Sequence, residues 1–145
     1  MRIHELGHVV LYVSNLTTSA DFYKNILGFK EIHRDLHTAL YSSGRTHHEL
    51  LLIEVGGKPK ESRAPTPGLY HIGFKIGNTD EELKEAIEEL TTKGVTLAGS
   101  ADHHVTHSLY VFDPDNNELE LYVDVDDSWK EDALKIMKPT QRLIL

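Results

Sequence analysis

The chain has 145 residues, a formal net charge of −8 with neutral histidines, and no cysteine. An acidic chain is a poor partner for nucleic acid or an anionic membrane surface, so we expect a small-molecule ligand and neither of those partners. No apolar run approaches the ~18 residues of a membrane helix, and the start MRIHELGHVV lacks the pattern of a signal peptide, so the expected location is cytoplasmic.

The first half of the chain predicts a strand, a helix and three further strands. Alternating apolar residues indicate a strand at 6–13. Helical spacing indicates a helix at 16–27, capped near Thr17 or Thr18 and ended by Gly28. Three short strands are expected after it, at 29–34, 37–42 and 47–55.

The second half repeats this order. The run YHIGFKI at 70–76 predicts a strand, and the capping box that begins at Thr79 predicts a helix over 80–92, ended by Gly94. Three more strands are expected, at 95–99, 108–112 and 118–124. Two successive βαβββ modules therefore predict an α+β fold.

We expect one domain over residues 1–145, because this length suits a single core. Module one covers about 4–55 and module two about 69–124, and the Pro- and Gly-rich segment 56–68 between them is predicted to be a linker. The tail 125–145 has a helix-like centre and an apolar end, and could cap the sheet or pack on another subunit. Exposed sheet edges of such modules favour a homodimer.

Three potential metal ligands lie opposite apolar strand faces. His8 and His71 hold matching places in matching strands, and Glu120 alternates with leucines in the last strand. If the helices cover the apolar faces, the opposite faces line a cavity. Two imidazoles and one carboxylate form the triad that suits Fe(II) or Mn(II) and leaves positions open for substrate and oxidant. On spacing alone, structural roles for the histidines and a solvated Glu120 stay open. The apolar residues expected opposite the three ligands are Val9, Leu11, Val13, Tyr70, Ile72, Phe74, Ile76, Leu119, Leu121 and Val123.

Three segments resemble the vicinal oxygen chelate superfamily: GHVVLYV…FYKNILGF, GLYHIGFKI and SLYVFDPDNNELELY. The resemblance covers roughly residues 4–124 and implies paired βαβββ modules that form a cup-shaped mixed sheet around a metal site, with the helices outside. The usual glycine of the DPDGN motif is Asn116 here, a residue that accepts the left-handed conformation. Glyoxalases, epimerases, fosfomycin-modifying enzymes, bleomycin-binding proteins and extradiol dioxygenases share this scaffold, so the fold alone does not select a reaction.

Two further segments resemble the extradiol ring-cleavage dioxygenases. THHELLLIEV at 46–55 is similar to their strand with an acid–base histidine, which corresponds to His48. ADHHVTHSLYVFDP at 101–114 is similar to the stretch that carries an active-site histidine and tyrosine, here His103 and Tyr110. The resemblance implies cleavage of a catecholic aromatic substrate by O₂, with Fe(II) or alternatively Mn(II) as the cofactor. His48 would take a proton from the diol, and His103 and Tyr110 would hydrogen-bond the diol or the developing charge.

Three histidines, His103, His104 and His107, lie close together in this stretch, so the choice among them stays open. The other chemistries of the superfamily also stay open. Glyoxalase- and epimerase-like members use a fourth ligand, a carboxylate from the fourth strand. We expect Glu49 to point away from the cavity. Six residues at ~3.3 Å each separate Glu54 from His48, so the two cannot both lie at the metal, and Glu54, beside Gly56 and Gly57 at the strand end, is expected to be a solvated rim residue.

A binding-only protein of the bleomycin-resistance type is another alternative, although such a protein needs no metal triad. The cavity is expected to suit an apolar or aromatic guest. Its lining candidates are Leu6, Val10, Leu50 and Leu52. Many extradiol dioxygenases carry a second pair of modules, whereas this chain has one pair.

Overall fold

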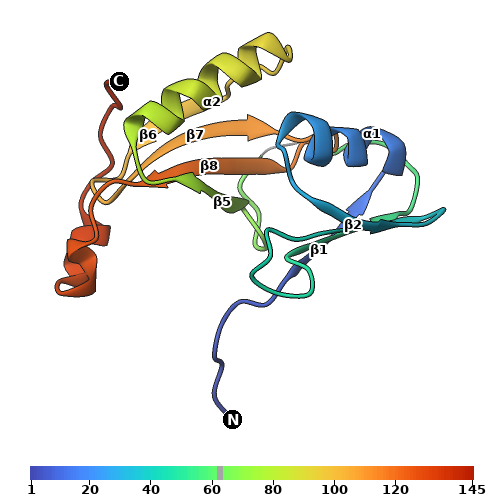
Figure 1. The fold of residues 1–145 in the computed structure, drawn as a ribbon, viewed down its shortest axis with the longest axis horizontal. Helices are drawn as coiled ribbons and strands as arrows, with labels where there is room; N and C mark the ends of the chain where they lie inside the picture. The colour runs from blue at the N-terminus through green and yellow to red at the C-terminus, as the bar shows by residue number, and fades with distance from the viewer. Residues whose placement is uncertain (62–63) are drawn as a thin grey trace. The chain divides into compact units, whose positions relative to one another are not determined.

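A computed structural model describes residues 1–61 and 64–145 (Figure 1). The chain forms two compact units, one of residues 1–63 and 113–116 (unit 1) and one of residues 64–112 and 117–145 (unit 2). Each unit contains one four-stranded mixed sheet. The α+β fold of two βαβββ modules is confirmed. The predicted linker 56–68 includes residues 62–63, which lie outside the described residues, and the division of the chain into one domain of two modules stays a prediction.

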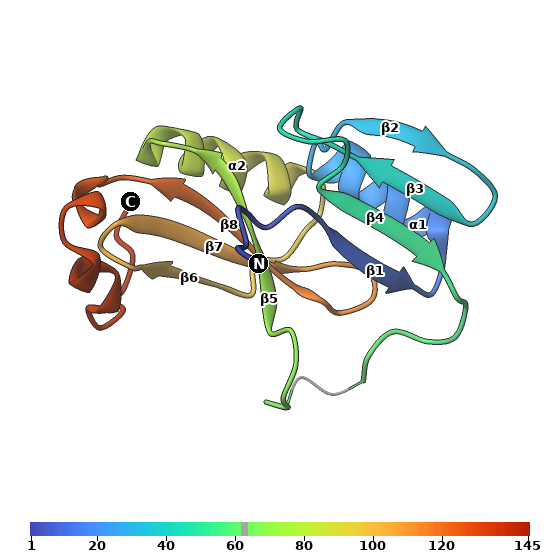
Figure 2. The same ribbon diagram turned by 90° about the horizontal axis from the view of Figure 1, so that it is seen from below.

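In unit 1 the sheet order is β1-β4-β3-β2, with β1 parallel to β4 and the other pairs antiparallel (Figure 2). The helical segment begins at Leu16, where the Asn15 side chain accepts a hydrogen bond from the Thr18 amide (2.8 Å). The cap itself is Asn15, and Thr17 and Thr18, which were expected near the cap, lie inside the first turn. The elements are β1 (Val9–Val13), α1 (Leu16–Asp21), the π-helix η1 (Phe22–Ile26), β2 (Glu31–Arg34), β3 (Thr38–Tyr41) and β4 (Leu50–Glu54).

One face of this sheet packs against α1, which contacts β3 and β4. Leu50 and Leu52 lie on that face and are 1 % and 0 % exposed, so the expectation that they line the cavity is wrong. The reason is the register of the parallel pair, which places Leu52 beside the buried Leu11 of β1. Val10 lies on the opposite, exposed face. The buried residues of the helix-covered face are Leu11, Val13, Ala39, Tyr41, Leu50 and Leu52.

The loop of residues 113–116 belongs to unit 1, where it is held by polar contacts. The Tyr23 hydroxyl donates to Asp113 Oδ2 (2.8 Å), and the Ser14 amide donates to Asp115 (3.1 Å). Asn116 has φ 61°, which confirms that it takes the left-handed conformation. Burial and the Asp113 carboxylate raise the pKa of Tyr23 well above its usual value. The DPD motif therefore ties this loop to the first helical segment.

In unit 2 the sheet order is β5-β8-β7-β6, and α2 contacts β5, β7 and β8. The capping box of Thr79 and Glu82 begins α2 as predicted. The strand predicted at 95–99 is instead at 99–102, because the Val95 amide closes the end of α2 on the Leu90 carbonyl (2.8 Å). The elements are β5 (His71–Gly77), α2 (Asp80–Thr92), β6 (Gly99–Asp102), β7 (Thr106–Phe112), β8 (Glu118–Asp124), and the 3-10 helices η2 (Ser128–Lys130) and η3 (Ala133–Met137).

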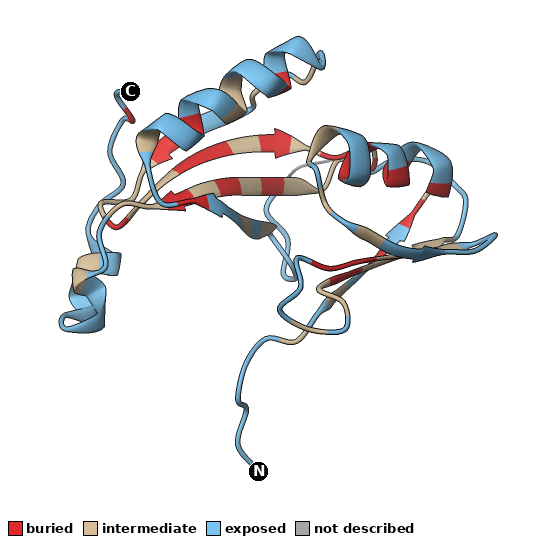
Figure 3. Cartoon of the chain, viewed as in Figure 1, coloured by how far each residue is buried: buried red, intermediate tan, exposed pale blue. Residues whose placement is uncertain are grey.

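In unit 2 buried and half-buried residues follow one another along β7 and β8 (Figure 3), and alternation places the buried apolar ones on the face that α2 covers. Leu119, Leu121 and Val123 are buried, as the alternation in the last strand predicts. The prediction that Tyr70 and Ile76 belong to the apolar buried set is wrong, since both side chains are exposed. Tyr70 lies before β5, and a register shift between Lys75 and Gly77 interrupts the pairing at Ile76. Among the described residues, no helix has the length and apolarity needed to cross a membrane.

Candidate metal centre

The open face of the sheet in unit 2, opposite α2, collects the polar residues of the candidate centre. Register places His71 beside Glu118, and Glu120 between Gly73 of β5 and Tyr110 of β7. Because alternate residues of a strand share a face, these side chains and Ser108 lie together on the face that α2 does not cover. The folding of the sheet therefore gathers them from three strands.

His71 and Glu120 form the centre of this group. The distance from His71 Nε2 to Glu120 Oε2 is 3.1 Å. Two neighbouring ligands at ~2.1 Å from one octahedral ion lie ~3.0 Å apart, so the pair fits adjacent positions on a divalent metal. Without an ion, the same separation is that of a hydrogen bond between imidazole and carboxylate.

The surroundings of the pair also fit a metal. A Cβ at Gly73 would come within 3.5 Å of Glu120 Oε2 and 3.4 Å of the Tyr122 ring, so the glycine leaves space beside the carboxylate. Within the described part of the chain, His71 Nδ1 is buried with no hydrogen-bond partner, and Glu118 Oε1 lies 3.8 Å from it. A metal-binding histidine commonly donates its second N–H to such a carboxylate. A small rotation of either side chain would complete this contact.

The second oxygen of Glu120 is held by neighbours on β7. Ser108 Oγ donates to Glu120 Oε1 (2.6 Å), and the Tyr110 hydroxyl lies 3.4 Å from the same atom. His103 Nε2 lies 2.8 Å from the Tyr110 hydroxyl and 3.8 Å from Glu120 Oε1. Burial and the Glu120 charge raise the pKa of Tyr110 to about 12, so its phenol is protonated at neutral pH.

The other two histidines of this stretch have different partners. His104 has φ 69°, and its Nε2 lies 2.8 Å from the Pro139 carbonyl oxygen. His107 lies 2.6 Å from Asp80, the first residue of α2, and 3.5 Å from Asp102. Of the three, His103 is the one that the structure places beside Tyr110 and Glu120.

Unit 1 brings the other two predicted histidines together. The ring centroids of His8 and His48 are 4.5 Å apart, and His47 packs on His48 at the same distance. Partial burial and the neighbouring His47 and His8 rings lower the pKa of His48 below its usual value, so its imidazole is neutral at pH 7. A neutral imidazole can accept a proton.

The complete triad stays a prediction, because His8 belongs to unit 1 whereas His71 and Glu120 belong to unit 2. Within the part of the chain that the structure describes, no three His, Asp or Glu side chains converge as a ready-made metal site. The pair in unit 2 is the part of the predicted ligand set that lies together.

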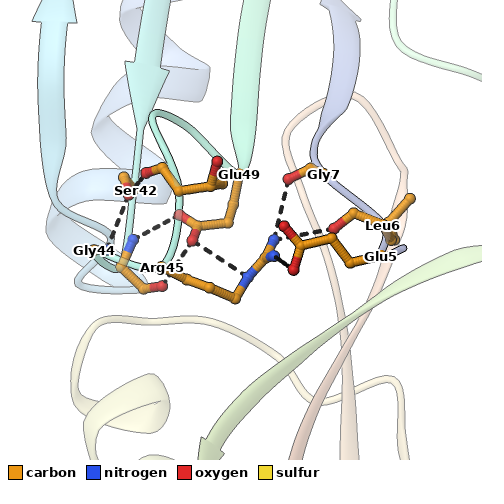
Figure 4. A network of polar contacts seen from close by, with 9 residues as sticks. Glu5, Leu6, Gly7, Ser42, Gly44, Arg45 and Glu49 are labelled. Atoms are coloured by element: carbon orange, nitrogen blue, oxygen red, sulfur yellow. Dashed lines mark hydrogen bonds and ion pairs between the residues drawn. The ribbon is translucent and has the colours of Figure 1, made fainter. Parts of the chain in front are cut away.

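Both carboxylates considered as a fourth ligand have protein partners. Glu49 accepts from the Ser43 amide (2.7 Å) and lies 3.6 Å from Arg45, which also donates to the Leu6 and Gly7 carbonyls (Figure 4). Burial alone would raise the pKa of Glu49, but hydrogen bonds from Ser43 and Ser42 outweigh it and lower this pKa below its usual value. Arg45 thus joins the segments that precede His8 and follow His48.

Glu54, the last residue of β4, lies on the helix-covered face with a half-buried side chain, 30 % exposed. Its Oε2 accepts from the Leu16 amide (2.7 Å) at the start of α1. Its Oε1 lies 3.7 Å from His37 Nδ1. The carboxylate therefore neutralises the helix N-terminus, a position that favours negative charge.

The sequence reasoning missed three residues of the centre. Ser108 precedes Tyr110 by two residues on the same face of β7, and alternation applied to that strand finds it. Gly73 precedes Phe74 in β5. The space that it leaves lies beside Glu120 only because β8 pairs with β5, and a single strand gives no sign of this. Thr140 lies in the tail, 3.1 Å from His103 Nδ1, and no local pattern indicates it.

Comparison with known proteins agrees with the fold and identifies the superfamily of the chain. The model of the Glyoxalase/Bleomycin resistance protein/Dioxygenase superfamily matches residues 5–121. The chain belongs to this superfamily. It is 25% identical to the glyoxylase/bleomycin resistance protein/dioxygenase domain from Frankia sp. EAN1pec, whose crystal structure superposes with a TM-score of 0.66 over 85% of this chain and 99% of that one.

Two curated relatives of this superfamily member have different activities. The catechol-2,3-dioxygenase of Bacillus subtilis (strain 168) is 32% identical over 90% of this chain, which spans 46% of that protein's length. The metallothiol transferase FosB of Staphylococcus epidermidis (strain ATCC 12228 / FDA PCI 1200) is 30% identical over 84% of this chain and 83% of its own length. The chain has similar sequence identity to these two enzymes of different activity, so sequence identity does not select a reaction.

Proposed function

We propose that the protein is a metal-dependent extradiol-type dioxygenase that cleaves the ring of a catecholic substrate. The observation that carries the proposal is the group of His103 and Tyr110 beside the His71–Glu120 pair. It supplies hydrogen-bond donors next to the proposed ligands, as extradiol chemistry needs. The 32% identity to a catechol-2,3-dioxygenase supports the same reaction.

In this proposal His8, His71 and Glu120 hold the metal. When bound, Fe(II) or Mn(II) supplies Lewis acidity to the diol and a route for electron density toward O₂. His48 accepts a proton from a diol hydroxyl, because its lowered pKa leaves the imidazole neutral. Tyr110 keeps its proton and donates a hydrogen bond to developing negative charge.

The fourth strand favours this chemistry over a glyoxalase- or epimerase-like one, which would need a carboxylate ligand from β4. The Glu54 carboxylate accepts from the helix amide of Leu16, and Glu49 is held by Ser43 and Arg45. Because both carboxylates have protein partners, we expect neither to bind the metal. A binding-only protein would not need the hydrogen-bonded series of His103, Tyr110 and Glu120. A small aromatic ligand and a homodimer are further parts of the proposal.

The test is anaerobic reconstitution with Fe(II), addition of a panel of catechols, and admission of air. Yellow ring-opened product and matching O₂ uptake are expected. The His48→Ala variant should keep the metal and lose most turnover, whereas His33→Ala, at an exposed position of β2, should behave as the native chain. Metal-loaded protein that forms no product from any catechol would reject the proposed reaction.

A further inference from the structure

The C-terminal tail reaches the candidate centre of unit 2. The amide of Gln141 donates to the Asp102 carbonyl (2.8 Å), and the amide of Asp102 donates back to the Gln141 carbonyl (3.0 Å). The Pro139 carbonyl lies 2.8 Å from His104 Nε2. These contacts fix the tail against the segment between β6 and β7 that carries His103.

Within this attachment, Thr140 Oγ1 lies 3.1 Å from His103 Nδ1. The other ring nitrogen, Nε2, lies 2.8 Å from the Tyr110 hydroxyl. His103 therefore has a hydroxyl partner at each nitrogen, one from the sheet and one from the tail. The Tyr110 hydroxyl extends the series to Glu120 Oε1, 3.4 Å away.

A neutral imidazole donates from one nitrogen and accepts at the other. If Nε2 carries the proton, it donates to Tyr110, which can donate onward to Glu120, and Thr140 donates to Nδ1. If Nδ1 carries the proton, it donates to Thr140, and Tyr110 donates to Nε2. A hydroxyl both donates and accepts, so Thr140 completes either arrangement.

We propose that Thr140 is a positioning residue, which holds the His103 ring and keeps both of its tautomers fully hydrogen-bonded. His103 can then present either a proton or a lone pair at Nε2 without leaving Nδ1 unpaired. The catalytic value of this device rests on the proposed function, whereas the positioning itself does not. Through Thr140, the C-terminal tail would help to orient a side chain of the candidate centre.

Two substitutions isolate the hydroxyl. Thr140→Val keeps the branched shape and removes the hydroxyl, and Thr140→Ser keeps the hydroxyl. The backbone bonds of Gln141 with Asp102 and the contact of Pro139 with His104 do not use the Thr140 side chain, so the tail stays attached in both variants. An unchanged amide NMR signal of Gln141 in each variant would show that the tail is still attached.

The first experiment records the ring ¹⁵N signals of the histidines in the metal-free chain of residues 1–145. Thr140→Val should shift the Nδ1 and Nε2 signals of His103, and Thr140→Ser should keep them native. Unchanged His103 signals in the valine variant would overturn the proposal. If Thr140→Val also shifts the Gln141 amide signal, the Thr140→Ser variant decides between the two explanations. His103 signals in Thr140→Ser that match those of Thr140→Val would then overturn the proposal.

The second experiment measures kcat and KM on a catechol with the Fe(II)-loaded variants. One lost hydrogen bond lowers kcat by about 3- to 10-fold in Thr140→Val at unchanged KM, and Thr140→Ser restores kcat. Equal kcat in the valine variant and the native chain would overturn the catalytic part. A native chain without catechol cleavage rejects the proposed function, while the ring signals still decide the role of Thr140.

Discussion

Removing the hydroxyl of Ser108 tests whether Glu120 is a metal ligand that the sheet holds in place. Ser108 is 0 % exposed, and its Oγ lies 2.6 Å from Glu120 Oε1. In Ser108→Ala the carboxylate loses this donor, and the Tyr110 hydroxyl at 3.4 Å replaces it only in part. Alanine fills nearly the same volume, so the change concerns the hydrogen bond and not the packing.

The size of the effect follows from two independent scales. Loss of a residue that hydrogen-bonds a metal ligand weakens metal affinity by about 10- to 100-fold, or roughly 1.4–2.7 kcal/mol. A hydrogen bond to a charged group contributes about 1.5–3 kcal/mol. The two ranges overlap, and partial replacement by Tyr110 places the expected loss of affinity for Ser108→Ala near the lower end, at about 10- to 30-fold.

The assay is an anaerobic competition titration of Fe(II) or Mn(II) against a chromophoric chelator. Ser100→Ala, at an exposed position of β6 in the same sheet, is the matched control and should bind as the native chain does. A Ser108→Ala variant that binds metal within about twofold of the native chain, while Glu120→Ala has lost binding, would refute the hydrogen-bond argument. Unchanged binding in Glu120→Ala would refute the ligand assignment itself.

Three further changes test other parts of the structure. Tyr23→Phe leaves Asp113 without its 2.8 Å donor and should lower the free energy of unfolding by about 1.5–3 kcal/mol in urea titrations; a loss below about 0.5 kcal/mol would contradict this. Glu54→Gln still accepts from Leu16 but lacks the charge at the helix N-terminus, so it should cost about 0.3–1 kcal/mol at native metal content, whereas reduced metal content would make Glu54 a ligand. Burial and the Glu31 charge raise the pKa of Tyr41 to about 12, above the ~10 of an unfolded chain, so its contribution to stability is complete below pH ~10 and is lost as pH rises toward 12. Urea titrations across this range should show a shallower decline in Tyr41→Phe, and an identical decline would refute the assignment.

The parts of the fold that follow from neighbouring residues could be predicted from the sequence. The capping box at Thr79 sets the start of α2, because both of its hydrogen bonds join residues three apart. Glu120 alternates with buried leucines in β8, so its face is settled by the strand itself. The contact of the His71 and Glu120 side chains also needs β5 and β8 to be neighbours in one sheet, where Glu120 lies two residues beyond Glu118, the register partner of His71.

The tail contact at Thr140 has no such local origin. Thr140 and His103 are 37 residues apart, and the bridge between Asp102 and Gln141 that joins them is isolated from the regular strands. An isolated bridge has no repeating pattern of apolar residues. The sequence therefore left the role of the tail open, although it indicated His103 and Tyr110.

The face of β4 was misassigned for a related reason. Its run LLLIE is apolar at four successive positions, so alternation is satisfied equally well with either face inside. The choice is made by pairing with β1, where Leu11 and Val13 are buried while Val10 and Tyr12 are exposed. Since residues paired across neighbouring strands share a face, Leu51 and Ile53 accompany Val10 and Tyr12 on the side away from α1. An apolar ligand bound by this sheet would contact the face of Val10 and Tyr12. Leu50 and Leu52, which the sequence placed in the cavity lining, instead pack on the side of α1.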